Sequence, residues 1–213
     1  MQDSFQNPDG SPNENPRRSV MLFTLVAGTC AAALPVLAVV ILLLARNPEL
    51  DSGIDVAVAF RLATWLTLSA GALWTLVELA QPDGSNRPWQ YLLPAPIILG
   101  SGVAAEFARS PSGQLAPRMM SSNPAACVAM ITLFSLPILT SVFYVLRSVA
   151  LRAPRLSGAA AGLLAGGISA SIYAWHCPER SLLFGATWDA IAVLLAAGIG
   201  TVLGRKYLRR AAE

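Results

Sequence analysis

Thiol, imidazole and carboxylate groups with metal-binding chemistry gather near the end of this sequence. His176 and Cys177 are adjacent, Glu179 follows two residues later, and Cys127 lies further upstream. Cysteine, histidine and carboxylate side chains are the ligands that soft divalent metal ions take. We therefore treat these four residues as a possible site for transient binding of a thiophilic metal ion, with no resident cofactor expected. The third cysteine, Cys30, is expected to be a small apolar filler.

Four charged residues, Arg61, Glu78, Glu106 and Asp189, lie within otherwise apolar stretches, where charge is costly and marks function by default, and Glu78 and Glu106 are close enough to a helix end to reach the interface. Arg61 and Asp189 are each about one to two helical turns from the same end of their helices, if the topology below is right. The sequence predicts that they face the interior and pair. Pairing of Arg61 with Glu106 is the alternative.

The elements that must position these residues are six long apolar stretches. A helix of about 20 residues rises about 30 Å, which matches the hydrocarbon core of a bilayer. A membrane-spanning segment is expected to be helical because a helix satisfies its own backbone hydrogen bonds. The predicted spans are Val20–Ala45, Val56–Ala80, Trp89–Phe107, Ala125–Leu146, Ser157–His176 and Leu183–Gly204. Short connections predict an all-α integral membrane protein, a six-helix up-and-down bundle.

Composition supports a multi-pass membrane protein. Hydrophobic residues make up 54% of the 213 residues and charged residues only 13%, against about 25% in soluble domains. The spans leave no room for a soluble catalytic domain, so an enzyme is not expected. A net charge of +3 does not indicate direct nucleic-acid binding, because the charges cluster at helix ends.

The distribution of basic residues predicts that both chain ends are cytoplasmic, because cytoplasmic loops carry the excess of Lys and Arg. With that orientation the inner segments hold Arg17, Arg18, Arg87, Arg147, Arg152, Arg155, Arg205, Lys206, Arg209 and Arg210. The outer segments hold Arg46, Arg109, Arg118 and Arg180. Residues 1–19 are expected to be a disordered cytoplasmic tail, since they contain too few apolar residues to fold alone. Residues 205–213 form a basic cytoplasmic tail after the membrane domain of residues 20–204.

Small residues recur at a spacing of four in the last two predicted helices, which allows close backbone approach in lipid. The glycines concerned are Gly158, Gly162, Gly166, Gly200 and Gly204. They predict packing of these two helices within one chain. A homodimer seam is the alternative, so the oligomeric state stays open.

Cys127 and Cys177 are expected to share one depth, because one opens the fourth helix and the other follows the fifth. That depth is the outer surface, which is oxidising in a bacterial envelope. Three interpretations remain open: a structural disulfide, a thiol pair that senses redox or thiophilic metals, or two unrelated cysteines. Aromatic residues at the same depth, Tyr173, Trp175 and Trp188, predict an interfacial belt.

Several motifs resemble the NrsF-type six-helix membrane anti-sigma factors over about residues 20–210. The strongest is the segment from His176 to Trp188, and Asp189 stands where an aromatic residue is expected. Further matches are Asn47-Pro48-Glu49-Leu50, Cys127, Arg155, and the stretch from Gly200 to Arg209. The N-terminal segment lacks the leucine-containing amphipathic stretch of the family. The alternative docking surface for a partner is therefore formed by the inner loops around Arg87 and 147–155 together with the basic tail 205–210.

The resemblance implies an inhibitor that holds an extracytoplasmic-function (ECF) sigma factor at the cytoplasmic side of the bilayer. It also implies that Cys127 and Cys177 sense metal or oxidative stress outside and that the sigma factor is then released inside. A small membrane transporter and a membrane thiol oxidoreductase are the alternatives. An oxidoreductase usually uses a proximal Cys-x-x-Cys pair, which this sequence lacks.

Overall fold

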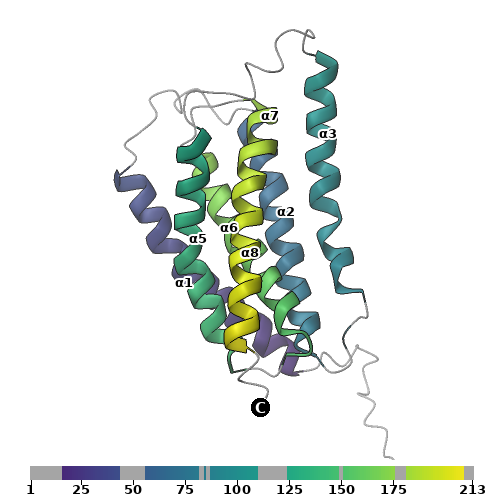
Figure 1. Ribbon diagram of the computed structural model, residues 1–213, viewed down its shortest axis with the longest axis vertical. Helices are drawn as coiled ribbons and strands as arrows, with labels where there is room; N and C mark the ends of the chain where they lie inside the picture. Colours follow the sequence, from purple (N-terminus) through teal and green to yellow (C-terminus); the bar gives the residue numbers. More distant parts are fainter. Residues whose placement is uncertain are drawn as a thin grey trace, which may run out of the picture.

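The computed structural model describes residues 16–43, 56–81, 84, 87–109, 124–148, 151–175 and 181–208, and these segments are helical, without strands. The α-helices are α1 (Pro16–Leu43), α2 (Val56–Leu79), α3 (Pro94–Arg109), α5 (Pro124–Leu146), α6 (Pro154–Ala174), α7 (Leu182–Phe184) and α8 (Ala190–Leu203). A 3-10 turn, η2 (Pro88–Leu92), precedes α3. Two π-helical turns, η3 (Gly185–Asp189) and η4 (Gly204–Leu208), flank α8 (Figure 1).

Six of these helices are long and apolar enough to cross a membrane, as the sequence predicts. They are Ser19–Ala38, Val56–Leu79, Pro88–Arg109, Pro124–Leu146, Pro154–Ala174 and Leu182–Leu208. The first helix begins at Pro16, inside the segment expected as a disordered tail, and the last continues past Gly204 to Leu208. The rest of the two predicted tails, residues 1–15 and 209–213, lies outside the described residues.

Proline residues set where most of these helices begin. Pro16, Pro88, Pro94, Pro124 and Pro154 each occupy the first position of a helical segment. Proline is favoured there because its fixed φ suits a helix and the first backbone N–H groups have no partner within it. This explains why the fourth and fifth helices begin slightly earlier than their apolar residues alone predict.

The Gly-, Ala- and Ser-rich helix α6 lies at the centre of the bundle and contacts α8, α2, α5 and α1. Most of its residues are buried, including Gly158, Gly162, Gly166 and Ser169. Small side chains let neighbouring backbones come close, which is how helices associate in a membrane. A composition that looks weakly hydrophobic thus marks the helix that the others surround.

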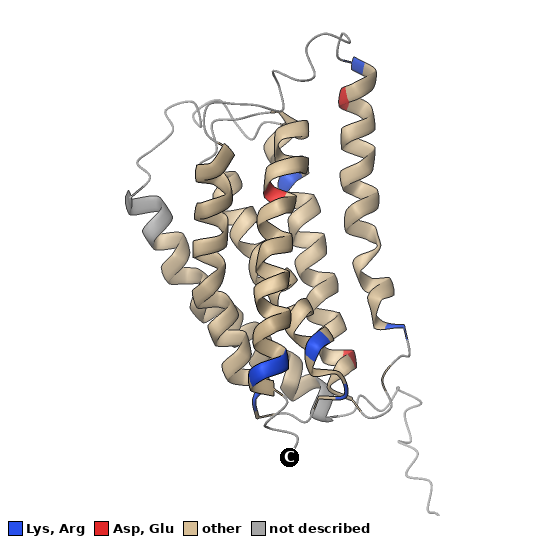
Figure 2. Cartoon of the chain, viewed as in Figure 1, with Lys and Arg blue, Asp and Glu red and all other residues tan. Residues whose placement is uncertain are grey.

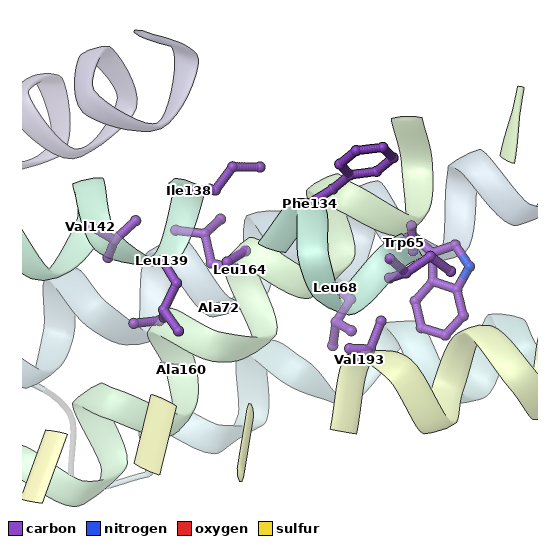
Figure 3. Close-up of a cluster of buried hydrophobic side chains, with 14 of the residues drawn as sticks. Trp65, Leu68, Ala72, Phe134, Ile138, Leu139, Val142, Ala160, Leu164 and Val193 are labelled. Atoms are coloured by element: carbon purple, nitrogen blue, oxygen red, sulfur yellow. The ribbon is translucent and has the colours of Figure 1, made fainter. Parts of the chain in front are cut away.

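The buried apolar side chains around α6 come from α2, α5, α6 and α8 (Figure 3). Trp65, Leu68 and Ala72 of α2 belong to this cluster together with Phe134, Ile138, Leu139 and Val142 of α5. Ala160 and Leu164 of α6 and Val193 of α8 complete the labelled residues.

Neighbours in space are not always neighbours in the chain. Helix α1 packs mainly against α5, where Ser141 Oγ donates a 2.8 Å hydrogen bond to the Gly28 carbonyl. Helix α3 stands at the edge of the bundle and contacts α2, η2 and α7 (Figure 1). Residue pairs along α6 and α8, such as Gly158 with Gly200 and Gly166 with Val193, show that these two helices run antiparallel.

Candidate functional site

A buried ion pair joins α2 to the π-helical turn η3. Arg61 Nη2 lies 2.7 Å from Asp189 Oδ2, and Arg61 Nε donates to the same oxygen at 3.0 Å. The two side chains are 3% and 0% exposed. The sequence placed Arg61 and Asp189 at one depth, and the structure brings them into contact. Glu106, the alternative partner, binds elsewhere.

Trp65 and Gly185 lie next to this ion pair. The Trp65 indole Nε1 donates to Asp189 Oδ2 at 3.3 Å, so one carboxylate oxygen accepts from three donors. The other oxygen, Oδ1, is buried and has no hydrogen-bond partner among the described residues. A Cβ atom at Gly185 would lie 2.9 Å from Arg61 Nε, so glycine at this position leaves the space that the arginine occupies.

Helix α3 is tied to the start of the last span by Glu106. Glu106 Oε1 accepts from Ser181 Oγ at 2.9 Å, and Oε2 accepts from the Leu183 backbone N–H at 2.9 Å. Ser181 is also the N-cap residue of α7, where its side chain accepts from the Phe184 N–H. A carboxylate that accepts backbone N–H groups at a helix start is stabilised by the helix dipole.

Cys127 lies in the first turn of α5 and is buried, at 6% exposure. Its thiol donates to Tyr173 Oη of α6 across 3.7 Å. Tyr173 was expected in an interfacial belt, but it is 7% exposed and belongs to the buried cluster. Cys30, expected as an apolar filler, is exposed on α1.

The other candidate metal ligands, His176, Cys177 and Glu179, lie outside the described residues. Among the segments that the structure describes, no group of three or more His, Cys, Asp or Glu side chains could hold a metal ion.

The five small-residue positions singled out in the sequence form one antiparallel seam between α6 and α8–η4. Cβ atoms at Gly158 and Gly200 would each collide with the other helix's backbone. Gly162 faces Ala196 and Ala197, Gly166 faces Val193, and Gly204 faces Pro154 and Gly158. The glycines thus pack within one chain.

We call the end of the bundle at which η4 (Gly204–Leu208) lies the η4 end, and the end at which α7 (Leu182–Phe184) lies the α7 end. The η4 end carries most of the exposed basic side chains. Arg152 Nη2 donates to the Glu78 carbonyl at 3.1 Å, and the Arg152 backbone N–H donates to the Leu79 carbonyl at 3.3 Å. These bonds attach the connection between α5 and α6 to the end of α2. Figure 2 shows blue segments gathered at this end. They include the exposed residues Arg87, Arg147, Arg152, Arg155, Arg205 and Lys206.

Sequence reasoning missed Trp65, Gly185 and Tyr173 as parts of these contacts. A helical residue's depth follows from its position in the span, but the direction it faces depends on how the helices pack. The spacing of Arg61 and Trp65, four residues apart on one helix face, is the signal that could have indicated Trp65.

The chain matches the family described as NrsF, negative regulator of sigma F, over residues 11–209. It is 32% identical over 204 residues to the anti-sigma-F factor NrsF of Caulobacter vibrioides, covering 94% of this chain and 92% of that protein. It is also 31% identical over 147 residues to the probable anti-sigma-F factor NrsF of Azospira oryzae, covering 67% of each. No solved structure matches significantly.

Proposed function

We propose a function that proceeds from the family: the chain belongs to the NrsF family, the negative regulators of sigma F. Its function is that of an anti-sigma factor held in the bacterial inner membrane, which binds an ECF sigma factor on the cytoplasmic side and keeps it inactive. The near full-length match to an anti-sigma-F factor carries this proposal. The role is regulatory rather than enzymatic.

The distribution of charge supports an orientation with the η4 end in the cytoplasm. Exposed arginine and lysine side chains gather there, whereas Arg109 is the exposed basic residue described at the α7 end. The excess of positive charge belongs on the cytoplasmic side of a membrane protein. The α7 end, with Cys127 and Tyr173, then faces outward.

In this proposal Cys127 and Cys177 react with a thiophilic metal ion or an oxidant and so report stress outside the cell. The thiol of Cys127 is packed against Tyr173, so its reaction changes the contact between α5 and α6. These two helices are joined at the η4 end by the segment that Arg152 attaches to α2. A displacement of α5 against α6 therefore reaches the cytoplasmic side through two continuous helices.

The sigma factor docks, in this proposal, at the η4 end, on the inner loops and the basic residues after α8. A signal can change partner affinity only by binding the two states of the bundle differently. A difference of about 1–3 kcal/mol between those states alters affinity about 5–150-fold, which is enough for release.

The test is affinity purification of the tagged chain from its own membranes, with identification of the soluble proteins that bind. The proposal predicts a sigma factor in the eluate of untreated cells. Serine at both Cys127 and Cys177 should leave that sigma factor bound after cadmium treatment. An eluate without a sigma factor would refute the anti-sigma role, whereas normal release from the double variant would refute only the thiol mechanism.

A further inference from the structure

The Arg61–Asp189 pair is more than a packing contact, because burial of two charges is costly. Removing both charges from water is offset only when geometry is good and the remaining polar atoms are bonded. Here Arg61 makes two hydrogen bonds to Asp189 Oδ2, while Asp189 Oδ1 has no partner among the described residues. The closed arrangement is thus less stable than a fully bonded one, which suits a contact that opens.

The backbone around Asp189 is also unusual. Asp189 ends the π-helical turn η3, a wider turn that occurs frequently at functional sites. Gly185, in the same turn, leaves room for the Arg61 side chain. The turn η3 therefore supplies both the Asp189 carboxylate, which accepts from Arg61, and the space at Gly185 that the Arg61 side chain occupies. Arg61 thereby connects η3 to α2.

The ion pair and the buried thiol are linked through helix α5. Helix α5, which carries Cys127, packs against η3, and Cys127 shares one buried cluster with Trp65, Tyr173 and Phe184. Trp65 itself donates to Asp189. Movement of η3 away from α2 would thus alter the packing of η3 on α5, the helix whose first turn carries Cys127.

We infer that the Arg61–Asp189 pair is a latch that holds the α7 end closed around Cys127. When the pair separates, η3 moves from α2 and the thiol becomes accessible. Under the proposed function, on which this part rests, the latch sets how much of the external signal is needed before the sigma factor is released.

The test measures how fast Cys127 reacts with N-ethylmaleimide in the purified full-length chain. Serine at Cys30 and Cys177 leaves Cys127 as the single thiol. Into this background we would introduce Arg61→Met with Asp189→Leu, which removes both charges so that neither is left unpaired. The latch predicts labelling at least about fivefold faster, the effect of a change of roughly 1 kcal/mol in the opening equilibrium.

Two further variants keep the result interpretable. Gly185→Ala pushes Arg61 aside without removing either charge, and it should also speed the labelling of Cys127. Thr187→Val is the matched control, because among the described residues Thr187 Oγ1 donates to the Leu183 carbonyl of the same span, and its loss should leave the rate unchanged. Cys30 as the single thiol, exposed on α1, should label at one rate with and without the latch.

Equal labelling rates of Cys127 in the background, the double variant and Gly185→Ala would overturn the latch. So would equal acceleration of Cys30 and Cys127, which indicates general unfolding. The assay contains no sigma factor, so a negative result leaves the anti-sigma role standing. Conversely, faster labelling in a chain that never retains a sigma factor would keep the latch and refute the proposed function.

Discussion

At the scale of single residues, two carboxylates make the main polar contacts at the α7 end. Asp189 Oδ2 accepts hydrogen bonds from Arg61 and Trp65 of α2, whereas Glu106 Oε2 accepts one from the backbone N–H of Leu183. The sequence indicated the ion pair because both residues lie at one depth in apolar helices. It did not indicate Tyr173 beside Cys127, because a tyrosine near a helix end is ordinarily explained by the interface.

Replacing one partner of the ion pair should be far more harmful than replacing both. Asp189→Asn keeps the shape of the side chain but removes the negative charge that Arg61 contacts in a buried site. A loss of about 3–5 kcal/mol in the free energy of unfolding is expected. Arg61→Met combined with Asp189→Leu should recover part of this loss, because neither charge of the pair remains, whereas the hydrogen bonds between α2 and η3 stay lost. Thermal unfolding in detergent measures both, and equal midpoints for the single variant and the unaltered chain would contradict the burial of this pair.

At the scale of elements, α6 and α8 approach so closely that only glycine fits at several positions on the sides that face each other. Gly162 faces the backbone of Ala196, whereas a Cβ at Gly198 would meet nothing within 4 Å. The sequence spacing of four predicted this seam, and the structure places both of its sides in one chain. The π-helical turns η3 and η4 left no trace in the hydrophobic pattern, since they change the backbone without changing which residues are apolar.

The same substitution should therefore have opposite effects on two faces of this helix pair. Gly162→Ala forces α6 and α8 apart and should lower the unfolding midpoint. Gly198→Ala should leave it unchanged or raise stability by about 0.5–1 kcal/mol, since alanine restricts the unfolded chain and favours a helix. Thermal melts of the two variants compare them directly. Equal destabilisation would show that the two faces are not distinct.

Arg152 makes a separate prediction for the connection between α5 and α6. Arg152→Ala removes its hydrogen bond to the Glu78 carbonyl, a partly buried contact with a charged donor whose loss should cost about 1.5–3 kcal/mol. Amide hydrogen exchange should speed up in residues 151–153 and at the end of α2. Arg155→Ala, on the first turn of α6, is the control that should not change exchange at Leu79. Unaltered exchange in the Arg152 variant would mean that this connection is held by other contacts.

At the scale of the whole molecule, the number and type of helices followed from length and hydropathy alone. Their arrangement did not, because similar apolar surfaces do not specify which helices become neighbours. Helix α1 packs mainly on α5 although α2 follows it in the chain. The central place of α6 follows from its small side chains, which matter for packing in lipid more than hydrophobicity does.

Orientation is the whole-molecule property on which the proposed sensing outside and the proposed binding inside depend. Reporter fusions at both chain ends should be active only in the cytoplasm, because the basic residues gather at the η4 end. A fusion within residues 110–123, between α3 and α5, should report the outer side. Periplasmic activity at either chain end would reverse the assignment of the two ends of the bundle.

The most direct test of the account follows the sigma factor in intact cells that are exposed to cadmium ions. In untreated cells the sigma factor should be recovered with the membrane fraction together with this chain. After exposure it should appear in the soluble fraction, but not in cells whose chain carries Cys127→Ser and Cys177→Ser. A sigma factor that is soluble from the start, or that leaves the membrane equally in both strains, would contradict a membrane anti-sigma factor controlled by these thiols.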